Sequence, residues 1–299
     1  MNLDTVAVLS TGEMGHMIAQ VLIKNGLKVV TCLRGRSDRT RQLAERVGVV
    51  SLPTIEDVVE ISDIIISVVV PSAAVALASA VATAIKKTNN LPLYADANAI
   101  SPMTSADIGD IISEAGGRYV DVSIIGPASK VGKSSTFCIS GEYAPHFAQL
   151  KSYGLHVRVL GDKIGQASAF KVLYAGFTKG LCSLMVELLL TARSNGILDQ
   201  IIEQYRLDYP ETTAFVDWFL PSFPFRAARR AEEMEELTQT IQKAGIKPFM
   251  APASEAVLRS ISELNLRRAY SDADEAKWKL QDVINILYPG IAGAGDSQR

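Results

Sequence analysis

A short glycine-containing segment near the N-terminus has the composition of a phosphate-binding turn. It consists of Ser10, Thr11, Gly12, Glu13, Met14 and Gly15, and it lies between the β-rich run Thr5–Leu9 and an amphipathic helical pattern. In a G-x-G-x-x-G turn the second glycine lets the backbone approach a pyrophosphate, and the third lets helix and strand pack closely. Gly12 and Gly15 occupy these places, whereas Ser10 replaces the first glycine. Because the N–H groups that open a helix are unpaired, the segment predicts a dinucleotide site.

The residues after the second predicted strand, Leu27–Leu33, indicate which dinucleotide is preferred. Enzymes that prefer NAD usually carry an Asp or Glu there, which binds the ribose 2′-hydroxyl. This chain has Arg34, Gly35, Arg36 and Ser37 instead. A guanidinium suits a 2′-phosphate, so the sequence favours NADP(H), with Arg34, Arg36 and Ser37 as candidate contacts. A solvated basic turn is the alternative interpretation.

An alternation of strands and helices must position these two segments. Apolar β-rich runs are separated by stretches in which apolar residues have helical spacing. The strands are expected at Thr5–Leu9, Leu27–Leu33, Val49–Leu52, Ile64–Val70, Leu93–Asp96, Tyr119–Ser123, Ser135–Ser140 and Val157–Leu160. Strands joined by helices imply right-handed βαβ units, so we predict an α/β Rossmann domain with a doubly wound, mostly parallel sheet.

The residues after Gly165 have helical periodicity throughout. No proline interrupts the run from Gly165 to Ser194, which as one helix would measure about 45 Å. Further helices are expected at Asp199–Asp208, Thr212–Phe219, Phe225–Ala244, Ala251–Glu263 and Asp272–Leu287, followed by a frayed tail at Pro289–Arg299. The predicted organisation is an NADP-binding Rossmann domain over residues 1–164, joined by a long helix to an all-α substrate and dimerisation domain over residues 165–299.

The composition excludes several classes of function. The chain has 299 residues, a hydrophobic share of 48% and a formal net charge of −2, which fits a globular protein and offers no basic field for nucleic acid. Its three cysteines are widely spaced and its three histidines are scattered. We therefore expect neither a disulfide framework nor a metal site.

One uncharged run, Ile64–Ile85, is long enough to span a bilayer. Pro71 and Ser72 divide it into an Ile/Val-rich part and an Ala-rich part, as in a buried strand followed by its covering helix. The N-terminus lacks the basic and apolar regions of a signal peptide. These patterns predict a cytoplasmic protein without a membrane segment.

Several motifs resemble, in order, those of the β-hydroxyacid dehydrogenase and 6-phosphogluconate dehydrogenase superfamily. They are Val8–Gly15, Gly35–Ser37, Val70–Pro71 and Asp96–Pro102 and, in a second half similar to the DUF1932 branch with its phosphogluconate-dehydrogenase-like C-terminal domain, Gly165–Lys171 and Arg229–Met234. The resemblance implies that Val70 and Pro71 line the nucleotide cleft and that Asn98 contacts the cofactor near the nicotinamide. It also implies an NADP-dependent oxidoreductase that acts on a hydroxy acid or a related alcohol or ketone by hydride transfer.

The catalytic lysine of this superfamily maps onto Lys171. The resemblance implies that Lys171 is the general acid and base that moves the hydroxyl proton during hydride transfer. A lysine in a partly apolar cleft loses solvation of its charged form, which lowers its pKa toward the working pH. Without the resemblance, a surface lysine on an amphipathic helix would be the simpler interpretation.

The candidate substrate contacts depart from the superfamily pattern. The usual D-x-P-V-S-G-G segment is Asp121–Pro127 here, with Ile125 at the serine position, and Tyr174 and Ala175 replace asparagines one turn past the lysine. Both changes remove polar groups that would hold a substrate carboxylate and hydroxyl, so a bulkier or less polar substrate is expected. The candidate substrate contacts are Ser123, Ile125, Gly126, Tyr174 and Arg230.

A basic cluster, Arg226, Arg229 and Arg230, has two interpretations. Its guanidinium groups could grip an anionic substrate with bidentate geometry. They could equally pair with the acidic residues that follow at helical spacing, which are Glu232, Glu233, Glu235 and Glu236.

Two other functions remain open, and a homodimer is expected. Val122–Pro127, Lys130–Gly132 and Ser140–Gly141 look like segments of imine reductases, which generally lack the lysine. An NADPH-binding sensor without catalysis is the third hypothesis, because the serine and the asparagines are lost. In the resembling families paired helical domains close each active site, which implies a homodimer through residues 165–299.

Overall fold

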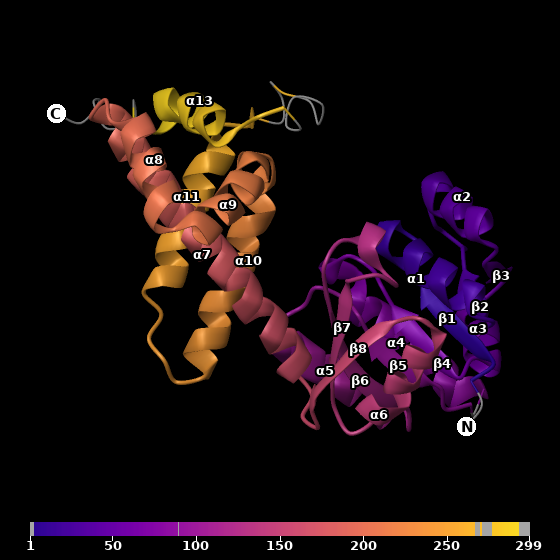
Figure 1. Cartoon of the computed structure of the whole chain (residues 1–299). Coiled ribbons are helices and arrows are strands. Elements are labelled where there is room, and N and C mark those ends of the chain that lie inside the picture. The colour runs from indigo at the N-terminus through magenta and orange to yellow at the C-terminus, as the bar shows by residue number, and fades with distance from the viewer. Residues whose placement is uncertain (1–2, 89, 267–269, 271–276, 293–299) are drawn as a thin grey trace. The chain divides into compact units, whose positions relative to one another are not determined.

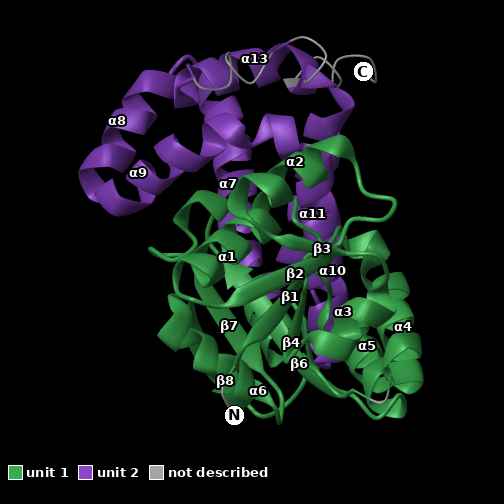
Figure 2. Cartoon of the chain, turned by 90° about the vertical axis from the view of Figure 1, so that its right-hand side faces the viewer, with its two compact units in different colours: residues 1–171 green, residues 172–299 purple. Residues whose placement is uncertain are grey.

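The computed structural model describes residues 3–88, 90–266, 270 and 277–292 (Figure 1). Its chain divides into two compact units, Met1–Lys171 and Val172–Arg299 (Figure 2). The division falls inside one helix, α7 (Gln166–Ser194), rather than at the expected boundary between residues 164 and 165. The first six residues of α7, Gln166–Lys171, thus belong to the N-terminal unit.

One eight-stranded sheet forms the N-terminal unit (Figure 1). Its strands are β1 (Thr5–Leu9), β2 (Lys28–Cys32), β3 (Val50–Leu52), β4 (Ile64–Ser67), β5 (Leu93–Asp96), β6 (Arg118–Ile125), β7 (Thr136–Ser140) and β8 (His156–Gly161). The order is β3-β2-β1-β4-β5-β6-β7-β8, and only the β6–β7 pair is antiparallel among the described strands. The predicted Rossmann fold with a mostly parallel sheet is confirmed.

Helices cover both faces of this sheet, as the alternating pattern predicts. They are α1 (Glu13–Lys24), α2 (Asp38–Val47), α3 (Ile55–Ile61), α4 (Pro71–Thr88), α5 (Pro102–Glu114), the short α6 (Ala144–Phe147), and the 3-10 turns η1 (Ala128–Lys130) and η2 (Ala148–Tyr153). Side chains of α1, α2 and α6 share one apolar core with the sheet, and those of α3, α4 and α5 share the other. Strands buried on both faces explain the near-continuous apolar runs in the sequence.

Strands β1 and β4 are parallel neighbours in the sheet, and the strand order reverses between them. After β1 the chain adds β2 and β3 on one side, and after β4 it adds β5 to β8 on the other side. In such sheets the loops after the two strands diverge and leave a crevice at the carboxyl edge, where nucleotides bind. The Ser10–Gly15 turn follows β1, and Val68–Val70 follows β4. The topology thus brings two of the sequence motifs to one place.

Strand β4 ends at Ser67 and is therefore shorter than the predicted run Ile64–Val70. The Val69 N–H donates to Oδ1 of Asn98 at 2.6 Å instead of to a neighbouring strand. The uncharged run Ile64–Ile85 otherwise folds as predicted, as strand β4 followed by helix α4.

The second unit is helical. After α7 come α8 (Leu198–Asp208), α9 (Pro210–Phe219), η3 (Leu220–Ser222), η4 (Pro224–Arg226), α10 (Ala227–Lys243), α11 (Met250–Glu263) and α13 (Leu280–Ala292). The expected tail at Pro289–Arg299 is partly wrong, because Pro289 lies inside α13; residues 293–299 lie outside the described part. Apolar side chains at helical spacing continue to Ile291, which packs on the helical core and extends the helix past the proline.

Within the described residues, α7 alone is long and apolar enough to cross a bilayer by length and composition. Core helices of globular proteins have the same properties. Residues of α7 such as Cys182, Val186 and Leu189 are buried in the apolar core of the helical unit. Packing within the helical unit thus accounts for the buried part of its apolar composition.

Candidate functional site

The Ser10–Gly15 turn has the geometry of a phosphate-binding loop. Gly12 is the extended N-cap of α1 and no side chain caps this helix, so the first N–H groups of α1 are open to a ligand. A Cβ on Gly12 would meet nothing within 4 Å. A Cβ on Gly15 would lie 1.9 Å from the backbone oxygen of Ser10, so only glycine lets the helix approach the strand. The turn fits the pyrophosphate of a dinucleotide.

Thr11, Glu13 and Met14 complete the predicted turn in different ways. Thr11 is buried, and its hydroxyl donates to the Thr40 carbonyl at 3.2 Å, which ties the turn to α2. Glu13 is exposed in the first turn of α1, while Met14 packs against the core. Only Glu13 of the three therefore presents its side chain to solvent.

The basic turn after β2 is shaped by glycine and capped by serine. Gly35 has a φ of +72°, and the Arg36 N–H donates to the Leu33 carbonyl at 3.1 Å. The Ser37 hydroxyl accepts from the Thr40 N–H at 3.3 Å and caps α2. Arg34 is exposed and Arg36 half-buried. Two guanidinium groups therefore stand where an NAD-preferring enzyme would carry a carboxylate.

Asn98 is buried and its amide is fully engaged within the protein. Its Oδ1 accepts from Val69 N–H, and its Nδ2 donates to Ser67 Oγ and Asp96 Oδ2, both at 2.9 Å. The structure therefore gives Asn98 the task of holding the loop that leads to Val70 and Pro71. Both of those residues are exposed at the carboxyl edge of the sheet.

A row of buried polar residues crosses the sheet at the same register. Ser67, Asp96, Asp121 and Ser140 are neighbours on β4, β5, β6 and β7, and each is at most 1% exposed. Ser67 and Asp96 are the last residues of the parallel strands β4 and β5, so the row lies at the sheet edge where the nucleotide turn stands. Burying a polar group costs desolvation free energy, so buried polar groups in proteins are normally hydrogen-bonded.

Asp121 bonds the beginning of α7. Its carboxylate accepts hydrogen bonds from Gly165 N–H at 3.1 Å, Ser168 N–H at 2.9 Å and Ser168 Oγ at 2.7 Å. Ser140 Oγ also donates to it at 3.2 Å and accepts from Ala167 N–H at 2.9 Å. A negative charge at a helix N-terminus is favourable, since the unpaired N–H groups and the helix dipole both attract it.

Lys171 stands one turn beyond this anchor and is half-buried. Its charge reaches Asp96, whose pKa is raised to about 6 mainly by burial, with Asp121 raising it further and Lys171 opposing the rise. The amide of Asn98 also lowers this pKa through its hydrogen bonds. The predicted catalytic lysine and two buried carboxylates thus form one electrostatic group.

Three candidate substrate contacts follow Asp121 along β6 and its exit. Ser123 lies two residues on, hence on the same face of the strand; it is fully buried, and its hydroxyl has no hydrogen-bond partner within the described residues. Ile125 is half-buried, and Gly126 has a φ of +118° with Ser135 against it. Ser123 thus carries a buried hydroxyl without a described partner, whereas the side chain of Ile125 is apolar.

The other two candidate substrate contacts belong to the helical unit. Tyr174 is 54% exposed on α7. Arg230 is only 4% exposed, donates to Ser222 Oγ at 2.9 Å and lies over the rings of Phe219 and Phe223 at 4.4 and 5.1 Å. Cation–π contacts of this kind compensate a desolvated charge. Arg230 thus packs on aromatic rings, whereas the predicted pairing with a following glutamate is made by Arg229, which lies 3.4 Å from Glu233.

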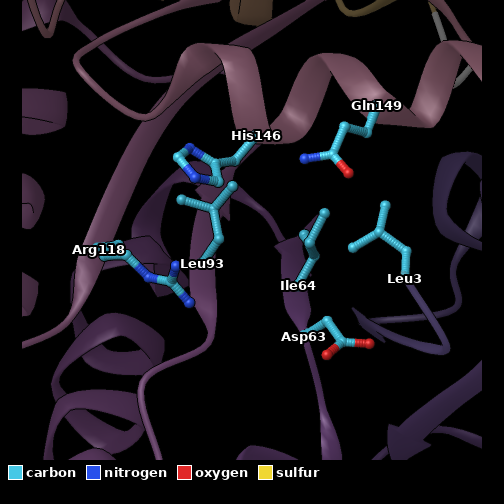
Figure 3. Close-up of a pocket in the computed structure, with 7 residues that line it drawn as sticks. All are labelled: Leu3, Asp63, Ile64, Leu93, Arg118, His146 and Gln149. Carbon is cyan, nitrogen blue, oxygen red and sulfur yellow. The ribbon is translucent and has the colours of Figure 1, made fainter. Parts of the chain in front are cut away.

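A small pocket opens at the other edge of the sheet, where β4, β5 and β6 begin (Figure 3). Its two charged groups bond the backbone: Asp63 accepts from the N–H groups of Asp4 and Thr5 at 2.9 Å, and Arg118 donates to the Leu91 carbonyl. This edge carries the amino ends of the parallel strands, where nucleotides do not bind in such folds.

No three His, Cys, Asp or Glu side chains gather as a metal site in the described parts of either unit.

Sequence reasoning did not select Ser67, Asp96, Asp121, Ser140 or Ser168 as site residues. Asp96 and Asp121 stood within the motifs, and each ends or interrupts an apolar strand. An acidic residue in a buried strand was the available signal, because such a residue needs partners.

Comparison with known proteins gives the family. The NAD-binding domain of 6-phosphogluconate dehydrogenase matches residues 5–153, and the DUF1932 domain of unknown function matches residues 192–261. An uncharacterised 28.5 kDa protein of Methanothermus fervidus is 30% identical over 86% of this chain and 99% of its own. This chain belongs to the 6-phosphogluconate and 3-hydroxyacid dehydrogenase family.

Solved structures of the family share the fold. A conserved protein of unknown function, described as similar to 3-hydroxyacid dehydrogenases, is 30% identical, with a TM-score of 0.75 over 88% of this chain and 98% of its own. The 3-hydroxyisobutyrate dehydrogenase of Mycobacterium tuberculosis is 15% identical, with a TM-score of 0.73 over 96% of this chain and 99% of its own. These matches support an NAD(P)-binding oxidoreductase that is similar to 3-hydroxyacid dehydrogenases and imine reductases.

The two glycines of this family member should fail in different ways. Gly15→Ala should cost about 1–3 kcal/mol of stability or more, because its methyl group meets backbone. Gly12→Ala should keep the wild-type melting temperature and lose nucleotide affinity, because its methyl group fills only the space in front of the helix. Thermal unfolding and calorimetric titration with NADPH measure both. Equal nucleotide affinity of Gly12→Ala and wild type would contradict the assignment.

Proposed function

We propose that the protein is an NADP-dependent dehydrogenase or reductase that moves a hydride between the nicotinamide and the carbon of an alcohol or ketone, with a hydroxy acid as the first substrate class to test. The observation that carries the proposal is the position of Lys171, one turn after the Asp121 anchor and within electrostatic reach of Asp96. When bound, the nicotinamide supplies the hydride chemistry. The remaining steps fall to side chains of this chain.

NADP(H) is proposed over NAD(H) because of the basic turn. Arg34 and Arg36 offer charge-assisted, bidentate hydrogen bonds to a 2′-phosphate. The open N-terminus of α1 behind Gly12 would hold the pyrophosphate. Val70 and Pro71 would line the cleft, placed by the Asn98 bond to Val69.

Lys171 is proposed as the proton-transfer residue. During oxidation its neutral amine would take the proton of the substrate hydroxyl as the carbon loses hydride, and during reduction its ammonium would return that proton. The bonds of Asp121 fix the first turn of α7, so the backbone of Lys171 is held in place before the substrate binds.

The substrate pocket differs from that of short β-hydroxyacid enzymes. The half-buried Ile125 cannot bond a carboxylate, whereas the buried hydroxyl of Ser123 has an unused donor and acceptor. An unpaired buried hydroxyl costs about 1–3 kcal/mol, which a polar ligand group would recover. A substrate with one polar group and more apolar surface therefore fits best.

Imine reduction is the second candidate, favoured by the same loss of carboxylate-binding groups at Ile125 and Tyr174. Imine reductases share this fold, but the presence of Lys171 favours the alcohol and ketone pair. Comparing rates with a cyclic imine and a keto acid separates the two. Tight NADPH binding without turnover across a carbonyl panel would instead support a sensor.

Removing Arg36 should weaken NADPH binding selectively. Arg36→Ala should cost roughly 1.5–3 kcal/mol of NADPH binding energy and leave NADH nearly unchanged, because a charge-assisted bond to the 2′-phosphate is lost. Arg46→Ala, at the far end of α2, is the matched control and should change neither affinity. Calorimetric titration of both cofactors measures this. Equal affinity of the wild type for NADPH and NADH would refute the preference.

Removing the amine of Lys171 should slow turnover without releasing the cofactor. Lys171→Ala should lower kcat by about 10²–10⁴-fold, since general acid–base groups contribute that much. Lys171→Arg should be similarly slow, because a guanidinium keeps the charge and does not deprotonate. Lys163→Ala, which removes an exposed lysine just before α7, is the control. Full turnover of Lys171→Ala on an accepted substrate would overturn the assignment, whatever its NADPH affinity.

We also propose a homodimer formed through the helical unit. Leu173, Phe177, Leu184 and Leu188 lie on one face of α7 at spacings of four, seven and four residues, and all four are exposed. Phe177 is 71% exposed. A continuous apolar stripe on a long helix is typical of an interface with another helix.

The protein should therefore have a dimeric mass at micromolar concentration. Phe177→Glu with Leu184→Glu should give a monomer, since charges would face each other across the stripe. Leu207→Glu, which changes an exposed leucine on α8, should remain dimeric. Light scattering coupled to size exclusion measures the mass. A monomeric wild type would refute the dimer.

A further inference from the structure

Asp96 is a buried carboxylate that the proposed proton transfer does not use. It is the last residue of β5 and is 1% exposed. Its Oδ1 accepts from the N–H of Asn98 at 3.0 Å, and its Oδ2 accepts from the side-chain amide of the same residue at 2.9 Å. A carboxylate in such a position costs several kcal/mol of desolvation unless charge or hydrogen bonds compensate it.

The fold brings Asp96 and Lys171 together through two fixed contacts. The β5–β6 register pairs Asp96 with Asp121. Asp121 in turn holds the N–H groups of Gly165 and Ser168, and Lys171 follows Ser168 by three residues, on the same side of α7. The strand register and the helix anchor therefore fix the start of α7, and with it Lys171, relative to the row of buried polar residues.

The titratable groups that face Asp96 come from three elements. Tyr94 lies on its own strand, Tyr119 and Asp121 lie on β6, and Lys171 lies on α7. Burial raises the pKa of both tyrosines, so they stay neutral at working pH. Asp121 directs its oxygens to the start of α7. Asp121 thus bonds the start of α7, whereas Asp96 makes its hydrogen bonds to Asn98 and none to α7 among the bonds described.

We propose that Asp96 is a positioning residue that sets the protonation of Lys171, holding its ammonium form and so fixing the pH at which the lysine can accept a proton. This inference rests on the proposed function. In oxidation the substrate O–H bond breaks and an N–H bond forms on Lys171 Nζ, while the hydride leaves with its electron pair to the nicotinamide. The new ammonium is stabilised by the negative charge of Asp96 and later releases its proton to water.

The test measures the ionisation of Lys171 directly, without turnover. Lysines are dimethylated with ¹³C-formaldehyde, and the NMR signal of Lys171, identified by its absence in Lys171→Arg, is followed against pH. Asp96→Asn should lower the pKa of Lys171 by about one to two pH units, because the loss of a nearby opposite charge shifts a pKa by about that much. The sign follows because removing a negative charge destabilises the ammonium.

Two controls separate charge from structure. Asn98→Ala removes the side-chain amide bond to Asp96 Oδ2 but keeps the backbone bond and the carboxylate itself, so the pKa of Lys171 should stay well above its value in Asp96→Asn. Asp63→Asn removes a carboxylate at the opposite edge of the sheet and should leave Lys171 unchanged. Should Asp96→Asn fail to fold, the wild-type titration still decides: the Lys171 signal should show a second inflection near pH 6, where Asp96 takes up its proton.

The outcomes distinguish this inference from the proposed function. An unchanged pKa of Lys171 in folded Asp96→Asn, or an equal fall in Asn98→Ala, overturns the inference even if Lys171 proves catalytic. A shifted pKa together with full turnover of Lys171→Arg supports the pair and removes Lys171 from the reaction. When both hold, the lysine-dependent limb of the kcat profile of Asp96→Asn moves to lower pH by the same amount.

Discussion

The rest of the site depends on the bond between a buried carboxylate and the start of a helix. Asp121 accepts two backbone N–H groups and the Ser168 hydroxyl from the beginning of α7. A carboxylate at this position satisfies donors that would otherwise be buried unpaired, and it interacts favourably with the helix dipole. Without this bond the direction in which α7 leaves the sheet would be undefined, and so would the position of Lys171.

A second constraint holds the nucleotide side of the site in shape before any ligand arrives. Asn98 joins the loop after β4 to the end of β5, and Thr11 joins the turn after β1 to the start of α2. Because these bonds exist within the protein, binding does not have to order those loops. A preorganised site loses less conformational entropy when it binds its ligand.

The sequence predicted what depends on local patterns. Glycines at 12 and 15, the alternation of apolar strands and helices, and the proline-free run before Ser194 all led to elements that the structure contains. Cross-strand register has no local signal, so the pairing of Asp96 with Asp121 was not predicted. The end of β4 at Ser67 was not predicted either, because it depends on the Asn98 side chain, which accepts the hydrogen bond of Val69 N–H in place of a neighbouring strand.

The contacts of Arg230 could not be predicted from the sequence either. Its neighbours in the sequence are charged, which suggested either a grip on an anionic substrate or ion pairs with the glutamates that follow. The helix period turns it inward, however, onto two phenylalanine rings that precede it by seven and eleven residues. Contacts of this kind depend on how several helices pack, which spacing along one helix does not reveal.

The division between the units, which falls just after Lys171, bears on how this kind of protein can diversify. The lysine, its anchor and the nucleotide turn are all encoded before that point, whereas Tyr174 and the apolar stripe of α7 are encoded after it. Recombination at this boundary would exchange one helical half for another and leave the proposed proton-transfer residue attached to the nucleotide-binding domain. New substrate ranges and new subunit pairings could thus arise without rebuilding the chemistry.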